Sequence, residues 1–150
     1  MKVYIALPMT FVNHYDPQKL FIELGELVRE YHLEPVLPND GMNPGKWSEL
    51  LEKHSFRTAS KVLVEHDLAL LRDSDAIIAL FHASTIGTSM ELVYARLWGK
   101  VTVVVVERDT VHHPWLWYHA DKIIYSTDIT GDGVRRACQW LNEHKAPPNS

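Results

Sequence analysis

The chain has 150 residues, of which 46% are hydrophobic, and its formal net charge is −4. This length suits one domain with a sizeable core. The small negative charge excludes the broad basic field that a long nucleic acid or an anionic membrane would attract, so small-molecule partners fit better. The single cysteine, Cys138, excludes an internal disulfide and a CxxC metal site.

The first segment, KVYIAL (2–7), is a short apolar run that predicts a buried strand. The run ends at Pro8 and is too short for a signal peptide or a membrane span, so we expect a cytoplasmic protein. Asp16 and Pro17 then provide an N-cap and a first-turn proline for a helix, whose apolar residues recur at helical spacing as far as Tyr31.

The rest of the chain alternates between strand and helix patterns. Apolar, often β-branched runs predict strands over 33–38, 75–81, 101–107 and 121–126. Helical periodicity predicts helices over 55–72, 88–98 and 131–144. The alternation predicts a single α/β domain over residues 1–145, of flavodoxin- or Rossmann-like type, with a parallel five-stranded sheet and helices on both faces. Residues 146–150 are expected to form a C-terminal tail.

In such a sheet, ligands bind beyond the carboxyl ends of the strands, at the point where the strand order reverses. Three segments should converge there: the loop 8–16, the loop 38–47 and the turn 82–90. The last of these leads directly into Glu91.

Glu91 has two interpretations. Thr88-Ser89-Met90-Glu91 matches a capping box, in which the glutamate reaches back to the helix N-cap. Alternatively, Gly87 and the short side chains after it would let a ligand approach the backbone closely. A carboxylate held there by the helix N-terminus would be a suitable nucleophile for a sugar carbon.

Asp67 is the second unusual carboxylate. It interrupts the apolar stripe of its helix, with Leu63, Leu70 and Leu71 at helical spacing from it. A carboxylate in such a position needs a partner or a chemical role. It serves either as a structural cap for a nearby loop or as part of a site.

Three blocks resemble the nucleoside 2-deoxyribosyltransferase family and its relatives, the nucleoside 5′-monophosphate N-glycosidases. They are VYIALPMT (3–10), HDLALLRDSDAIIAL (66–80) and GTSMELVYARLWGK (87–100). The resemblance implies that Glu91 is the nucleophile, that Asp67 serves proton transfer to the departing base or binds it, and that Tyr4 holds the nucleophile by a hydrogen bond.

The resemblance also implies a set of substrate contacts. Asn39 and Asp40, in the LPND loop (37–40), are candidates for contacts to the base. Trp47 would stack on a base or seal the edge of the core. The remaining contacts are expected from Pro8, Gly87 and Ser89, which lie within or beside the matching blocks.

Two positions depart from the family pattern. Leu7 stands where the family usually has the glycine before the proline. Thr85 stands where transferases that act on free nucleosides often have an aspartate that binds the 5′-hydroxyl. An aspartate would repel a 5′-phosphate whereas a threonine hydroxyl can donate to it, so Thr85 favours a nucleotide substrate.

The resemblance implies a homodimer or a larger homo-oligomer in which the loop after the fourth strand completes a neighbouring site. In that stretch, His112 or His113 would donate to a phosphate, or both would simply face solvent. Trp115 and Trp117 would pack the interface between subunits. No further cluster of His, Asp or Glu accompanies the histidines, so no metal is expected, and no cofactor is implied.

The sequence therefore favours an enzyme that cleaves the N-glycosidic bond of a nucleoside or deoxynucleoside through a covalent glycosyl-Glu91 intermediate and transfers the sugar to another base. The first alternative is a hydrolase, a nucleoside 5′-monophosphate N-glycosidase. The second is a non-catalytic nucleotide-binding module in which Glu91 is a cap.

Overall fold

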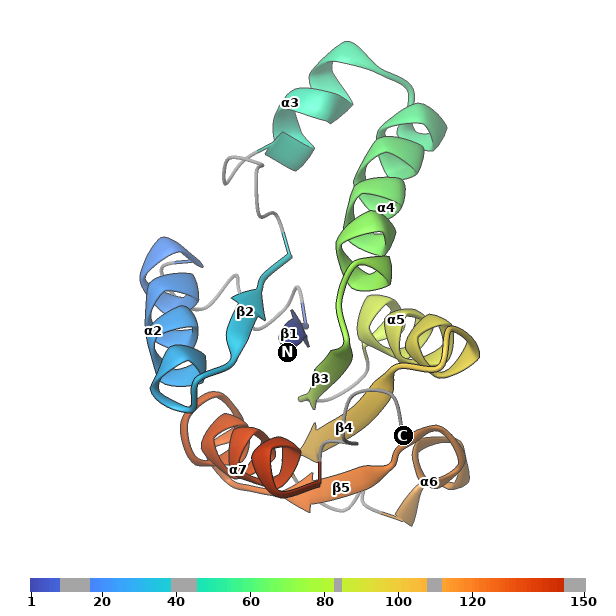
Figure 1. Cartoon of the computed structure of the whole chain (residues 1–150). Helices are drawn as coiled ribbons and strands as arrows, with labels where there is room; N and C mark the ends of the chain where they lie inside the picture. The colour runs from blue at the N-terminus through green and yellow to red at the C-terminus, as the bar shows by residue number, and fades with distance from the viewer. Residues whose placement is uncertain (9–16, 39–45, 83–84, 108–111, 145–150) are drawn as a thin grey trace.

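The computed structural model describes residues 1–8, 17–38, 46–82, 85–107 and 112–144. Its strands form one parallel sheet in the order β2-β1-β3-β4-β5 (Figure 1). The strands are β1 (Lys2–Ala6), β2 (Glu34–Val36), β3 (Ala76–Phe81), β4 (Val101–Val106) and β5 (Lys122–Tyr125). The order reverses between β1 and β3, as in the flavodoxin-like sheet. The predicted fold class is confirmed, and each strand lies within its predicted range.

The helices in the described part of the chain are α2 (Pro17–Glu30), α3 (Lys46–Lys53), α4 (Phe56–Arg72), α5 (Ile86–Leu97), α6 (Pro114–His119) and α7 (Val134–His144). A π-helical turn, η2 (Ile129–Gly133), leads into α7. Helix α2 begins at the predicted proline, whereas Asp16 lies outside the described residues. The sequence did not predict α3, α6 or the π-helical geometry of η2.

Side chains alternate along each buried strand and so divide between two cores. One core lies between the sheet and helices α2 and α7, and includes Ile5, Ile78 and Val105. The other lies between the sheet and helices α4, α5 and α6, and includes Tyr4 and Ile77. Both faces of the sheet are therefore covered, which explains why the central strands are continuously apolar.

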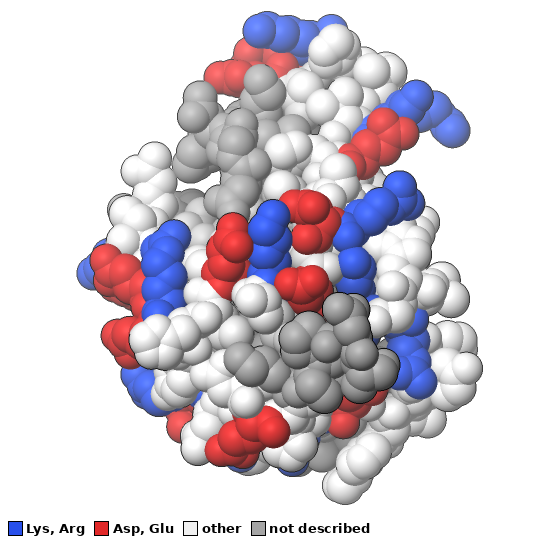
Figure 2. Space-filling view, viewed as in Figure 1, with Lys and Arg blue, Asp and Glu red and all other residues white. Residues whose placement is uncertain are grey.

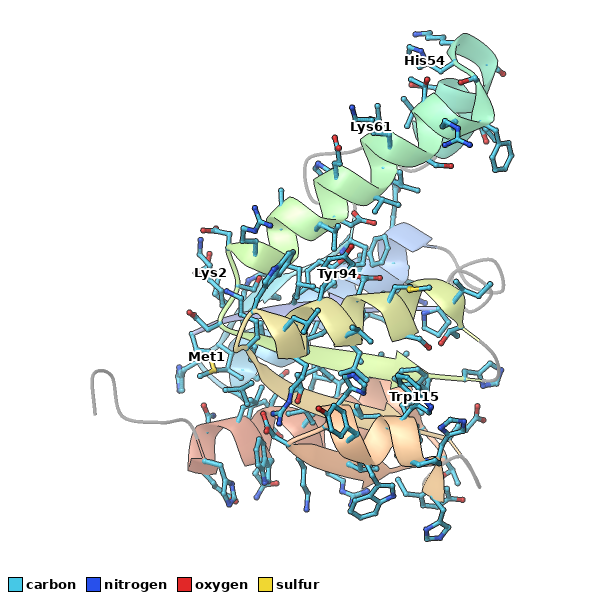
Figure 3. The ribbon with its side chains drawn as sticks, turned by 90° about the vertical axis from the view of Figure 1, so that its right-hand side faces the viewer. Met1, Lys2, His54, Lys61, Tyr94 and Trp115 are labelled. Atoms are coloured by element: carbon cyan, nitrogen blue, oxygen red, sulfur yellow. The ribbon has the colours of Figure 1, made fainter. Side chains whose placement is uncertain are left out.

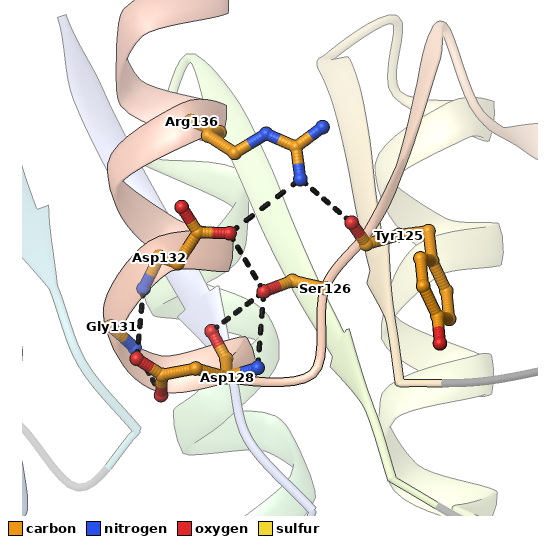
Figure 4. Close-up of polar contacts among 6 residues, drawn as sticks. All are labelled: Tyr125, Ser126, Asp128, Gly131, Asp132 and Arg136. Atoms are coloured by element: carbon orange, nitrogen blue, oxygen red, sulfur yellow. Dashed lines mark hydrogen bonds and ion pairs between the residues drawn. The ribbon is translucent and has the colours of Figure 1, made fainter.

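The turn between β5 and α7 is held by side chains rather than by packing alone (Figure 4). The Asp128 carboxylate accepts hydrogen bonds from the backbone N–H groups of Gly131 and Asp132. Ser126 Oγ donates to Asp132 Oδ2 at 2.9 Å, and Arg136 donates to the Tyr125 carbonyl oxygen at 2.7 Å. A Cβ at residue 131 would collide with the Asp128 carboxylate and displace it from these hydrogen bonds.

Helix α3 and the first half of α4 extend beyond the sheet (Figure 1). The face drawn in Figure 2 carries charges of both signs close together, as expected from the small net charge. Within the described residues, no helix is both long enough and apolar enough to cross a bilayer. The predicted tail, 146–150, lies outside the described residues.

Candidate active site

Helix α5 starts earlier than its sequence predicts, and this changes the interpretation of Glu91. Thr85 is the N-cap residue, with extended backbone angles, and the helix runs from Ile86. Glu91 therefore lies in the second turn, too far along the helix to reach back to the N-cap as a capping-box glutamate does. The capping-box interpretation, with Thr88 as the cap, is wrong. Glycine is more typical of a turn than of the first turn of a helix. For this reason the sequence predicted that the helix begins after Gly87.

Glu91, on α5, and Tyr4, on β1, lie on the same side of the sheet. Tyr4 is the third residue of β1, fully buried, on the face that α4 and α5 cover. Its phenol lies close enough to the Glu91 carboxyl group to lower the pKa of that group as a hydrogen-bond donor. A buried tyrosine needs such a partner for its hydroxyl, and an ionised carboxylate is a strong acceptor.

Burial dominates the acidity of Glu91. Loss of water around the carboxyl group raises its pKa from 4.5 to about 7, the hydrogen bond from Tyr4 opposes this rise, and the negative charge of Asp67 adds to it. Asp67 belongs to α4, is partly buried, and has a fully buried Oδ1 atom. Three residues from β1, α4 and α5 therefore form one electrostatic cluster, Tyr4, Asp67 and Glu91.

The backbone beside Glu91 is open on one side. Apart from its chain neighbours and the backbone of its own helix, a Cβ at Gly87 would meet only the Glu91 Oε1 atom among the described residues, at 3.9 Å. Thr85 Oγ1 and Thr88 Oγ1 are both buried, and neither has a hydrogen-bond partner among the described residues. Buried hydroxyls without partners are uncommon in proteins, and a bound ligand would supply what they lack.

Ser89 is differently placed. It is exposed, and its hydroxyl donates to the Thr85 carbonyl oxygen at 2.7 Å. This bond lies within the first turn of α5, so Ser89 shapes the helix start rather than offering an unused donor.

The other predicted contacts are distributed around the same edge of the sheet or lie outside the described residues. Pro8 is buried two residues beyond β1. Asn39 and Asp40 lie outside the described residues, and Trp47 belongs to α3, where only its backbone is described. His113 is the N-cap of α6, and its Nδ1 accepts the Trp115 N–H at 3.3 Å.

One pair was not found from the sequence. His82 follows β3 and contacts Glu107, which follows β4. The two residues are 25 positions apart, so only the order of the strands brings them together. Among the described residues, no group of three or more His, Cys, Asp or Glu side chains is arranged to hold a metal ion.

No protein-family profile matches the chain, and no curated protein sequence matches it either. Solved structures do match. A 2-deoxyribosyltransferase from Bacillus psychrosaccharolyticus superposes with a TM-score of 0.61 at 16% identity, covering 87% of this chain and 91% of that one. The CMP N-glycosidase BcmB from Clostridium botulinum gives 0.55 at 16% identity, covering 95% and 98%. A conserved protein from Enterococcus faecalis V583 gives 0.53 at 18% identity, covering 91% and 87%. At these identities the matches establish a shared fold.

Proposed function

We propose that this protein is an enzyme that cleaves the N-glycosidic bond of a nucleoside or deoxynucleoside through Glu91 and transfers the sugar to a second base. The observation that carries the proposal is the Glu91 side chain, whose Oε2 atom is fully buried and whose pKa Tyr4 lowers and Asp67 raises. Two of the solved structures with this fold are a 2-deoxyribosyltransferase and a CMP N-glycosidase, which supports the same class of reaction.

The chemistry follows from the three side chains. The ionised Glu91 oxygen attacks C1′ of the sugar while the bond from C1′ to the base breaks, and the electron pair leaves with the base. Asp67 supplies or stabilises the proton that the departing base needs. A nitrogen of the second base then attacks C1′ and gives up its proton to Asp67, the ester to Glu91 breaks, and the Glu91 carboxylate is restored. The hydrogen bond from Tyr4 favours the ionised form of Glu91 that the first step requires.

A non-catalytic binding module has less support. In that alternative Glu91 would be a helix cap, but it lies in the second turn of α5. Burial raises the pKa of Glu91 from 4.5 to about 7 in the folded protein. The folded protein therefore loses stability as pH rises through this range, because the unfolded chain releases the proton more readily. A chemical role explains why the chain retains such a group.

A specific observation favours the hydrolase as a second candidate, acting on nucleoside 5′-monophosphates with water in place of the second base. The Thr85 hydroxyl is buried at the N-terminus of α5 and has no hydrogen-bond partner within the described part of the chain. A helix N-terminus suits an anion, and threonine adds a donor without negative charge.

We also propose that the protein forms a homodimer or larger homo-oligomer. Helices α5 and α6 lie side by side and expose Ile86, Met90, Tyr94, Leu97, Trp115, Trp117 and Tyr118, which we call the α5–α6 surface. Figure 3 looks onto these helices, with Tyr94 and Trp115 labelled. All but Tyr94 are more than half exposed. Large apolar and aromatic side chains grouped in this way are typical of subunit interfaces. A second copy on this surface would lie beside the β3–α5 turn.

Replacing Glu91 with glutamine tests the central proposal. Glu91→Gln keeps the size and hydrogen-bonding capacity of the side chain but removes the nucleophilic anion, so turnover should fall by several orders of magnitude while folding survives. Nucleosides and their 5′-monophosphates are incubated with and without a second base, and released and exchanged bases are measured by chromatography.

Glu30→Gln, at an exposed position on α2, is the matched control and should retain full activity. Exchanged products identify a transferase, and free base alone identifies a hydrolase. A Glu91→Gln protein with undiminished turnover would refute the covalent mechanism, and a wild type that binds nucleotides without releasing base would support the binding module.

A further inference from the structure

Thr88 is a polar residue on the buried face of α5. It shares this face with Leu92 and Ala95, and only 2% of its surface is exposed. Its Oγ1 atom is fully buried and has no hydrogen-bond partner among the described residues. Burying a hydroxyl without a partner is costly, so the presence of this group calls for an explanation.

Packing alone does not explain the hydroxyl. Valine is β-branched like threonine, has a similar helix propensity, and carries a methyl group in place of the hydroxyl. Beside Leu92 and Ala95, a valine would fill the same space without burying an unpaired polar atom. The hydroxyl of Thr88 therefore points to a ligand that supplies its partner.

Thr88 lies next to the proposed nucleophile. Glu91 follows it by three positions, and residues at this spacing on a helix have Cβ atoms about 5 to 6 Å apart. The Glu91 side chain extends back toward the start of α5, since its Oε1 atom is 3.9 Å from the position that a Cβ on Gly87 would occupy. A sugar carbon in contact with the Glu91 carboxyl group would therefore be close to Thr88.

The stereochemistry of a nucleoside indicates which of its groups meets Thr88. In the common β-anomer of a ribonucleoside, the base projects from one face of the sugar ring, and the 2′- and 3′-hydroxyls project from the other. A nucleophile attacks C1′ on the face opposite the departing base, which is the face that carries these hydroxyls. Because C2′ is bonded directly to C1′, the 2′-hydroxyl is the sugar hydroxyl nearest to the attacking Glu91 oxygen.

We propose that the Thr88 hydroxyl forms a hydrogen bond with the 2′-hydroxyl of the substrate and so selects ribonucleosides over 2′-deoxynucleosides; the inference rests on the proposed N-glycosidic function. A deoxynucleoside has a CH₂ group at this position and would leave the Thr88 hydroxyl buried without a partner. Hydrogen bonds to this sugar hydroxyl strengthen in the transition state, so the selection acts on kcat/KM.

The test compares three nucleosides that carry the same base on ribose, 2′-deoxyribose or arabinose. Thr88→Val should lower the ratio of kcat/KM for the ribonucleoside to kcat/KM for the deoxynucleoside by about 5- to 100-fold, because the 2′-hydroxyl is then buried without its partner. Thr88→Ser keeps the hydroxyl, so this ratio should stay within about threefold of the wild-type ratio. Arabinose carries its 2′-hydroxyl on the face of the base, away from Glu91. Thr88→Val should therefore not change the ratio of arabinonucleoside to deoxynucleoside.

Thr58→Val is the matched control, because it makes the same substitution at an exposed position on α4 and should leave the ribose-to-deoxyribose ratio unchanged. The proposal is overturned if the wild type prefers the deoxynucleoside or if Thr88→Val does not change the ratio. Equal slowing of both substrates in Thr88→Val also overturns it, since the hydroxyl would then serve the 3′-hydroxyl or a bound water.

Thermal unfolding provides a measurement that does not depend on catalysis. Thr88→Val replaces a buried hydroxyl with a methyl group, so the melting temperature of the free protein should stay the same or rise. A clear fall would show that the hydroxyl stabilises the fold, and it would overturn the proposal.

Direct binding separates this inference from the proposed function. If the wild type releases no base from any of the three nucleosides, the N-glycosidic function fails, and calorimetry with the ribonucleoside and the deoxynucleoside then decides on Thr88. Tighter binding of the ribonucleoside by the wild type, lost in Thr88→Val, supports recognition of the 2′-hydroxyl. Equal affinities in the wild type, or a difference that Thr88→Val retains, reject it.

Discussion

Glu91 and Tyr4 illustrate how burial and hydrogen bonding act on one carboxyl group in opposite directions. Burial raises the pKa of Glu91 to about 7, and the hydrogen bond from Tyr4 lowers it. At neutral pH a substantial fraction of the free protein therefore carries a proton on the proposed nucleophile. Activity should follow the fraction that has lost this proton.

Replacing Tyr4 with phenylalanine should move the pH dependence of activity. In the wild type, kcat/KM for a nucleoside should rise with pH and level off above about 7, as Glu91 ionises. Tyr4→Phe removes the hydrogen bond that favours the anion, so the rise should move to higher pH and activity below pH 7 should fall. The measurement is a pH profile of kcat/KM. A profile that keeps its midpoint in Tyr4→Phe would show that the phenol does not control the nucleophile.

Asp67 should affect both the leaving base and Glu91. Asp67→Asn removes the proposed help to the departing base, so cleavage should slow by a larger factor for bases that leave poorly than for good leaving groups. It also removes a negative charge that raises the pKa of Glu91, so the rise in the pH profile should move to lower pH, opposite to Tyr4→Phe. Kinetics with a series of bases measures the first effect.

Asp75→Asn is the control for Asp67. The Asp75 carboxylate accepts a hydrogen bond from the Lys2 backbone N–H at 2.7 Å, at the start of the sheet. Loss of this carboxylate should lower the melting temperature, and any change in activity should be the same for all bases. Equal slowing across all bases in Asp67→Asn would instead indicate that Asp67 is structural.

The start of helix α5 is not capped by the side chain of its N-cap residue. Thr85 is its N-cap residue but makes no capping hydrogen bond through its side chain. Aspartate and asparagine are better caps than threonine. The helix is therefore less stable than it would be with a better N-cap residue. This is expected if the Thr85 hydroxyl binds a ligand instead of capping the helix.

Thr85→Asp should separate helix stability from substrate binding. The new carboxylate should cap α5 and favour its dipole, so the melting temperature should stay the same or rise. The same charge should repel a phosphate, so kcat/KM for a 5′-monophosphate should fall at least tenfold more than that for the nucleoside. Thr85→Asn, a cap of the same size without charge, should show much less discrimination. Equal losses on both substrates in Thr85→Asp would remove the phosphate from this end of the site.

Helix α6 is an element that its local sequence pattern could not predict. The segment PWLWYH has a proline at the first helical position after the His113 cap, which is a helix-start signal. It is only six residues long, too short for periodicity to identify it. Its buried Leu116 and His119 fix it against the rest of the fold, and this packing is a tertiary effect.

The α5–α6 surface should control self-association of the protein. Leu97 is 74% exposed there, whereas Ile22 is 60% exposed on α2, on the opposite side of the sheet. Leu97→Glu should shift the protein toward monomer in sedimentation velocity, because a buried unpaired charge is costly at an interface. Ile22→Glu should leave the oligomeric state unchanged. A wild type that sediments as a monomer, or a Leu97→Glu protein that stays oligomeric, would contradict the proposed interface.

Sequence alone determined the class of fold, because strands covered on both faces must be continuously apolar and the helices between them must have one apolar face. It also singled out Asp67, because it interrupts an apolar stripe, and Glu91, because it follows Gly87 and two short side chains. These properties depend on residues close together in the chain. The core segments could be predicted for this reason, whereas α3, α6 and the start of α5 could not.

The arrangement of the site depends on contacts between distant parts of the chain. The pKa of Glu91 depends on Tyr4 and Asp67, which reach it from β1 and α4, and the contact between His82 and Glu107 depends on β3 lying next to β4. Strand order and helix packing bring these residues together across long stretches of chain. Burial and electrostatic interaction depend on distance in space, so a pattern confined to neighbouring residues cannot predict them.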